Sequence, residues 1–216
     1  MKLFSLLAFI LLLGSGCSMQ LPPNQWQIQS ANAFESYTKN FLAGHDAVAT
    51  GDLKRAIAHA KAGGDFESLA RIYLGMCALR ISVGRPDKCS EYQEIAEFTS
   101  DPSLKNYYTL LQNNTEAIEP SLLPRPYNSF AEHMQKKEYA LAFASLEDAP
   151  ISSKLIGAAL LKEHLSIAQA ENILERASFY GYKKSVLYWL GVLEELNEST
   201  SEKEAIRKKI EILKRR

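Results

Sequence analysis

Little of the side-chain chemistry from which enzymes and metal centres are built is present in this chain. Its histidines are scattered singly, with no second histidine or close cysteine at metal-ligand spacing; they are His45, His59, His133 and His164. Gly63-Gly64 lacks the lysine and further glycines of a phosphate-binding loop, and no serine lies in a nucleophile motif. We therefore expect no enzymatic activity, no metal site and no non-covalent cofactor.

An excess of charge of either sign is also missing. The 25 lysines and arginines balance 25 aspartates and glutamates, so the formal net charge is 0. Such a chain has no overall positive field to attract nucleic acid, and no nucleic-acid partner is expected. A hydrophobic fraction of 46% with 23% charged residues is typical of a folded domain.

Basic residues do gather at the end of the chain, over 203–216. This segment has two acidic residues, Glu204 and Glu211, and seven basic ones: Lys203, Arg207, Lys208, Lys209, Lys214, Arg215 and Arg216. This candidate basic patch could contact anionic lipid, a glycan or an acidic partner. Alternatively, the cations only suit the C-terminal end of a helix.

Hydrophobic runs long enough to cross a membrane are absent as well. The longest predominantly apolar stretch, from Leu3 to Leu13, is too short for a membrane-spanning helix. It follows the basic residue Lys2 and leads into small residues that end at Cys17. This order predicts a secretory signal peptide over residues 1–16.

The residues Leu13-Gly14-Ser15-Gly16-Cys17 resemble the lipobox of bacterial lipoproteins. In that family the cysteine receives diacylglycerol and the signal is cut directly before it; leucine usually lies three residues before the cysteine, where this chain has Gly14. The resemblance implies a lipidated first residue, Cys17, carrying a palmitate-type anchor that holds the protein at a membrane. The alternative is an ordinary signal peptide followed by an incidental cysteine.

The residue after the cysteine bears on which membrane carries the protein. By the same resemblance, Ser18 favours the outer membrane of a two-membrane host, with the domain facing the periplasm. In a one-membrane host the cell membrane would take its place.

Residues 17–33 are expected to be an extended tether. They contain Pro22-Pro23 and several amide side chains, with little periodic apolar character. Trp26 and Ile28 within it could either dock on the domain or lie among lipid headgroups.

Lipidation of Cys17 would leave two cysteines, Cys77 and Cys89, on either side of a predicted turn at 84–87. In an antiparallel helical hairpin they come near each other, so they are a disulfide candidate in an oxidising compartment. Two separate buried thiols are the alternative.

From Phe34 onward, apolar residues recur at three- and four-residue intervals, which predicts an all-α fold of about ten to eleven helices. A break is expected at Gly51-Asp52, and three prolines in 119–126 are expected to divide the fold into halves 34–118 and 127–216. The expected helices cover roughly 34–50, 53–62, 66–83, 87–98 and 101–111, then 127–136, 138–148, 152–163, 166–180, 183–197 and 200–215.

Several segments resemble tetratricopeptide or Sel1-like repeats. They are the hairpin-like 43–56 and 136–142 and the helical pairs Leu74-Gly75 and Leu190-Gly191. The resemblance implies antiparallel helix pairs stacked into a solenoid whose concave groove binds peptides or proteins. An irregular helical bundle is the alternative.

Four aromatic residues late in the chain could line such a groove or belong to the core: Tyr180, Tyr182, Tyr188 and Trp189. Asn197, within Glu195-Leu196-Asn197-Glu198-Ser199, resembles the acidic sequon of some bacterial oligosaccharyltransferases and is a candidate glycosylation site.

Together these features lead us to expect a protein-binding scaffold or adaptor lipoprotein. It would serve one or more envelope proteins, in outer-membrane protein insertion, in a secretion or pilus system, or as a flagellar motor accessory. The alternatives are a peptidoglycan- or glycan-associated envelope protein and a surface-exposed lipoprotein.

Overall fold

A computed structural model describes residues 24–215, and within them the all-α expectation is confirmed: there are eleven α-helices and no strand. The signal peptide over 1–16, Cys17 and the tether as far as residue 23 lie outside the described residues. The helices are α2 (Gln25–Ala43), α3 (Asp46–Ala62), α4 (Phe66–Ser82), α5 (Ser90–Gln93), α6 (Pro102–Leu111), α7 (Asn128–Gln135), α8 (Tyr139–Ala144), α9 (Ile151–Leu160), α10 (Ile167–Phe179), α11 (Lys183–Leu196) and α12 (Thr200–Lys214).

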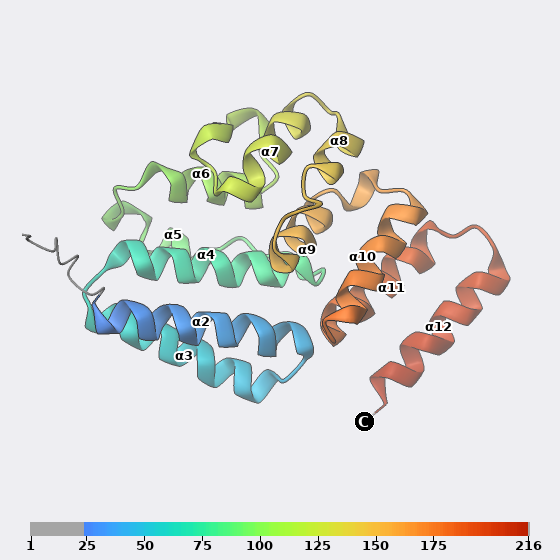
Figure 1. Cartoon of the computed structure of the whole chain (residues 1–216), viewed down its shortest axis with the longest axis horizontal. Coiled ribbons are helices and arrows are strands. Elements are labelled where there is room, and N and C mark those ends of the chain that lie inside the picture. The colour runs from blue at the N-terminus through green and yellow to red at the C-terminus, as the bar shows by residue number, and fades with distance from the viewer. Residues whose placement is uncertain (1–23, 216) are drawn as a thin grey trace, which may run out of the picture.

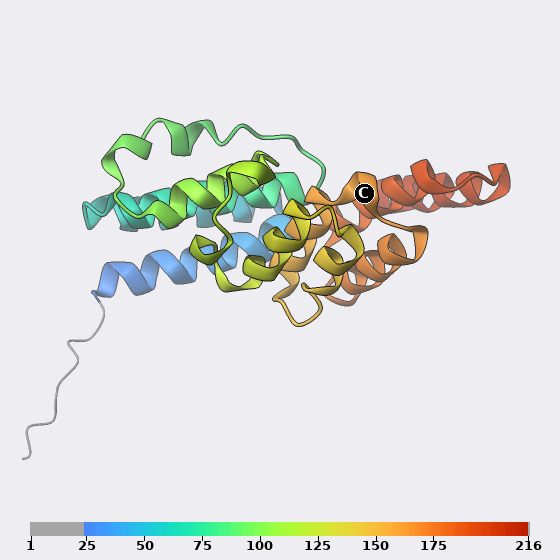
Figure 2. The ribbon, with the colours of Figure 1, turned by 90° about the horizontal axis from the view of Figure 1, so that it is seen from above.

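The helices follow one another along an elongated molecule, largely as antiparallel neighbours (Figure 1). α2 pairs with α3, α7 with α8, and α10 with α11, while α12 packs on α11 at the far end. α4 occupies the centre and contacts α2, α3, α6 and α9. α4 lies between α6 and α2 in Figure 1, and the view from above shows α12 at the end of the molecule opposite the start of α2 (Figure 2).

The expected tether is wrong over residues 25–33, because α2 begins at Gln25. Ser30 and Ala33 are buried, and the Ser30 hydroxyl donates a hydrogen bond of 2.9 Å to the Ala56 carbonyl of α3. Ser30, Ala33 and Tyr37 recur at helical spacing, so the amide-rich segment has a narrow face of small and aromatic residues that packs on α3.

The break expected at Gly51-Asp52 is also wrong, since α3 runs through both residues from Asp46. Asp52 is buried and accepts a 2.7 Å hydrogen bond from the side-chain amide of Asn40 on α2. The chain instead turns at Gly44, where a φ of 87° is readily available only to glycine. The buried carboxylate therefore cross-links the two helices.

The proline-rich segment interrupts the helices without dividing the core. It forms two 3-10 turns, η3 (Pro120–Leu122) and η4 (Arg125–Tyr127), and the Asn128 side chain donates to the carbonyls of Pro120 and Leu123. One continuous cluster of buried residues extends from Tyr37 to Leu193. The packing does not follow the expected halves 34–118 and 127–216.

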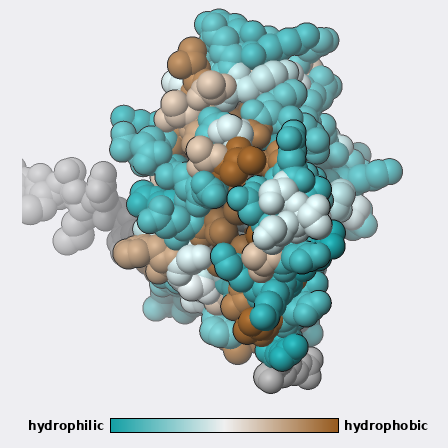
Figure 3. Space-filling model, turned by 90° about the vertical axis from the view of Figure 1, so that its right-hand side faces the viewer, coloured by the Kyte–Doolittle hydropathy of each residue, from teal (hydrophilic) through white to brown (hydrophobic). Residues whose placement is uncertain are grey.

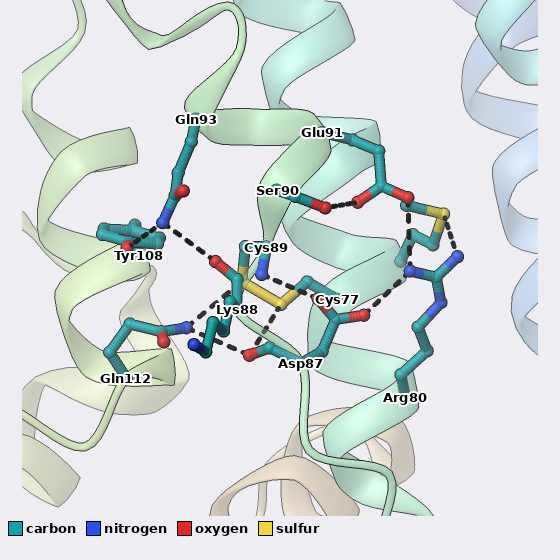
Figure 4. Close-up of a disulfide and its surroundings, with 11 residues drawn as sticks. Cys77, Arg80, Asp87, Lys88, Cys89, Ser90, Glu91, Gln93, Tyr108 and Gln112 are labelled. Carbon is teal, nitrogen blue, oxygen red and sulfur yellow. Dashed lines mark hydrogen bonds and ion pairs between the residues drawn. A yellow bond between two sulfur atoms is a disulfide. The ribbon is translucent and has the colours of Figure 1, made fainter.

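A disulfide joins Cys77, late in α4, to Cys89, with their Cα atoms 5.3 Å apart (Figure 4). Around it, Asp87 accepts a 2.7 Å hydrogen bond from the Cys89 amide and an ion pair of 2.8 Å from Arg80. Cys89 has a φ of 54°, which stops a helix from running through it. The single helix expected over 87–98 is therefore replaced by the four residues of α5 and by the 3-10 turn η1 (Ala96–Phe98).

Candidate partner groove

Two adjoining hollows form one groove between α2, α4, α6 and α9. They have volumes of about 330 Å³ and 480 Å³ and share Phe34, Thr38, Arg71 and Ser152. The second hollow continues along α2 to Gln27, near the start of that helix. The groove therefore follows much of the length of α2.

The floor of the groove is apolar. It is lined by Leu74, Gly75 and Leu79 of α4, by Leu104 and Tyr107 of α6, and by Ile156 of α9. Phe34 of α2 lies directly over Gly75, where a Cβ atom would overlap its ring. The absence of a side chain at Gly75 thus lets Phe34 pack closely against α4.

Two tyrosines, the buried Tyr127 and the partly buried Tyr107, support the floor. The rings of Tyr107 and Tyr127 have their centroids 5.6 Å apart, and the Tyr127 hydroxyl donates a hydrogen bond of 3.4 Å to the Ser153 carbonyl. Burial raises the pKa of Tyr127 to about 12 and that of Tyr107 well above its ordinary value. Both phenols therefore stay neutral at physiological pH.

The rim of the groove is polar and carries an ion pair. Arg71 contacts Asp101 at 2.8 Å, and the Arg71 side chain is 58% exposed. Asp101 also caps α6, accepting a 2.9 Å hydrogen bond from the Ser103 amide. The pKa of Asp101 is lowered, chiefly by hydrogen bonds from Ser103 and also by Arg71, while partial burial acts in the opposite direction.

The aromatic residues predicted to line a groove do not do so as a set. Trp189 is fully buried and Tyr182 is buried, so both belong to the core. Tyr188 packs against Gly84, and Tyr180 is 49% exposed on the surface. The core alternative therefore applies to Trp189 and Tyr182, whereas Tyr188 borders a separate hollow together with Ile81 and Lys162.

Most basic residues of α12 are exposed, and the side of the molecule on which this helix lies is largely hydrophilic (Figure 3). Lys208, Lys209, Lys214 and Arg215 are exposed, whereas the Arg207 guanidinium donates to Glu194 of α11 at 2.6 Å. Lys203 is half-buried. Arg216 lies outside the described residues.

Asn197 follows the last residue of α11. Its side-chain nitrogen, the atom to which a glycan would be attached, donates a hydrogen bond of 2.8 Å to the Leu193 carbonyl. The side chain is half-buried. Glycosylation at Asn197 would therefore require this C-terminal hydrogen bond to open.

Among residues 24–215, one cluster of possible metal ligands occurs, at Cys77, Asp87 and Cys89. Both sulfur atoms belong to the disulfide, so they offer no thiolate to a metal.

Within residues 24–215, no helix is long and apolar enough to cross a membrane.

Comparisons of the chain with protein-family models, with curated proteins and with solved structures find no match.

Proposed function

We propose that this protein is a lipid-anchored adaptor that binds a segment of a partner envelope protein in the groove between α2, α4, α6 and α9. The continuous apolar floor beneath a polar rim carries this proposal. Grooves of this composition take up aliphatic and aromatic side chains, while rim hydroxyls and amides satisfy a bound backbone. Ser152, Ser153 and Thr38 supply such rim groups.

The location of this activity is proposed from the sequence. The lipobox-like residues up to Cys17 favour a protein held at a membrane, and Ser18 favours the outer membrane with the domain in the periplasm. The partners would be components of an envelope assembly, such as outer-membrane protein insertion, a secretion or pilus system, or a flagellar motor. The pairs of helices would serve as a tetratricopeptide-like platform.

A bulky side chain in the groove tests partner binding. Ser152 lines both hollows and is half-buried, so Ser152→Trp places an indole where the partner segment would lie. Ser178 is exposed on α10, outside the groove, and Ser178→Trp is the matched control. We expect Ser152→Trp to reduce co-purification of the specific partner at least tenfold and Ser178→Trp to leave it unchanged, with equal unfolding midpoints.

Retention of the partner by Ser152→Trp would overturn the groove as the binding site. The anchor is tested separately with Cys17→Ser, which should yield an unprocessed or soluble form without lipid. Recovery of a lipidated product from that variant would contradict the assignment of Cys17.

A further inference from the structure

An exposed pair of aromatic side chains lies where α4 begins. Phe66, the first residue of α4, is 44% exposed, and Phe98 of η1 is 58% exposed. Their ring centroids are 5.2 Å apart. Phe66 also borders a hollow of about 400 Å³, together with Leu69, Tyr73 and Ile95. Exposed apolar surface of this kind marks a contact surface.

The described chain begins at the same end of the molecule. The Trp26 ring of α2 packs on Gly63, where a Cβ atom would overlap it, and Gly63 lies three residues before Phe66. Ile28, one turn into α2, is 44% exposed. The starts of α2 and α4 lie together at the left of Figure 1.

The length of chain outside the structure limits where this end can lie. Residues 18–23 separate Cys17 from Asn24, and the seven residue steps between the two Cα atoms span at most about 25 Å even when the chain is fully extended. The 19 residues of α2 are themselves about 28 Å long. A lipid on Cys17 therefore holds the start of α2 close to the bilayer.

We propose that Ile28, Phe66 and Phe98 form a membrane-contact surface that inserts into the interfacial layer of the bilayer to which Cys17 is anchored. This inference rests on the proposed lipid anchor. Aromatic side chains favour the boundary between headgroups and acyl chains. Contact there would orient the groove, whose Gln27 end lies near the membrane and whose remainder leads away from it.

The charges near this surface indicate which lipids it contacts. Lys61 is accompanied by Asp65 and Glu94 around the hollow, and Glu97 precedes Phe98. Without a basic cluster, anionic lipid adds no attraction. The surface is therefore expected to bind zwitterionic phosphatidylcholine through apolar contact, with little dependence on salt.

A second exposed aromatic pair supplies a matched control. Phe179 and Tyr180, which follow one another at the end of α10, are 81% and 49% exposed, with ring centroids 5.2 Å apart. They lie near the opposite end of α2, because the neighbouring Lys184 of α11 pairs with Asp46 just beyond that end. They have the chemistry of the proposed surface without its proximity to the anchor.

Fluorescence quenching by brominated lipid tests the contact. The mature full chain is reconstituted in phosphatidylcholine vesicles carrying brominated acyl chains, with Phe98→Trp or Tyr180→Trp adding one reporter to the native tryptophans. We expect at least half of the added fluorescence of Phe98→Trp to be quenched and that of Tyr180→Trp to be unaffected. Ile28→Ser with Phe66→Ser should at least halve the quenching of Phe98→Trp.

Equal quenching of the two reporters, or none of Phe98→Trp, overturns the membrane-contact surface. The proposal is also overturned if the environment of the Phe98→Trp reporter changes only when a partner protein is added and not when the vesicles are added. The intact mass of the reconstituted chain separates this failure from that of the anchor. A lipid on Cys17 with an unquenched reporter refutes only the contact surface, whereas a chain without lipid overturns both proposals.

Discussion

The ammonium nitrogen of Lys184 lies 3.9 Å from the centroid of the Phe41 ring. The same ammonium pairs with Asp46 at the start of α3, and the Lys184 side chain is only 11% exposed. These contacts tie α11 to the hairpin of α2 and α3 across 138 residues of sequence. In an open solenoid each repeat contacts only its neighbours. This contact instead closes the arc of helices.

Replacing Lys184 should weaken that closure. Lys184→Met retains an apolar chain but removes the cation, and we expect the free energy of unfolding to fall by about 1 kcal/mol. The adjacent Lys183 is exposed, so Lys183→Met should change it by less than about 0.5 kcal/mol. Urea denaturation of both variants measures the difference. Equal stabilities would contradict a stabilising role for the contact.

The disulfide should stabilise the fold appreciably. Because Cys77 and Cys89 are 12 residues apart, the bond restricts the unfolded chain, and Cys77→Ala with Cys89→Ala should cost about 2 to 4 kcal/mol. Reductant should lower the stability of the wild type but leave the double variant unchanged. Both cysteines are buried, so reduction should require denaturant. Sensitivity of the double variant to reductant would contradict this account.

The carboxylate of Asp101 should stabilise the groove rim in a pH-dependent way. Its pKa is lowered in the folded state, so its charged form contributes stability above the unfolded pKa of about 3.8, and this is lost as pH falls through the folded pKa. Asp101→Asn keeps a capping side chain but loses the charge. At neutral pH we expect this variant to be less stable by under about 1 kcal/mol, because the Arg71 pair is exposed.

Chemical denaturation between pH 2 and pH 7 checks this prediction. The difference in the free energy of unfolding between the wild type and Asp101→Asn should shrink toward the acidic end of that range. A difference that stays constant down to pH 2 would mean that the charge of Asp101 contributes nothing to the stability.

The two leucine-glycine pairs should respond to alanine in opposite directions. Gly75→Ala would place a methyl group against the Phe34 ring and should cost about 1 to 3 kcal/mol. At Gly191 no atom other than the adjoining backbone of α11 and the neighbouring residues lies within 4 Å of the added Cβ position, so Gly191→Ala should stabilise α11 by up to about 1 kcal/mol. Thermal unfolding measures both. Stabilisation by Gly75→Ala would contradict the close packing of Phe34 on α4.

Helix periodicity predicted much of the secondary structure. The helix expected over 66–83 is α4, Phe66–Ser82, and those expected over 183–197 and 200–215 are α11 and α12. These elements begin after capping residues or tight turns that are visible in the sequence. The errors at Gly51-Asp52 and over 25–33 have a tertiary cause. The partners of Asp52 and Ser30, namely Asn40 and Ala56, lie on the other helix of the pair.

The groove was harder to predict than the helices. Leu74-Gly75 was interpreted as a repeat marker. Nothing local in the sequence indicates that Phe34 would cover Gly75, or that α9 would complete the rim of the groove. Tyr182 and Trp189, in contrast, look like binding residues by composition and are buried. Which aromatic residues reach a surface depends on how distant helices pack.

Site-specific photo-cross-linking in living cells tests the adaptor function most directly. A photoreactive phenylalanine derivative replaces Ser152 in the groove or Ser178 on the exposed face of α10. The proposed function predicts one defined envelope protein attached at position 152 and absent at position 178. No protein adduct at position 152, or the same adducts from both positions, would contradict it.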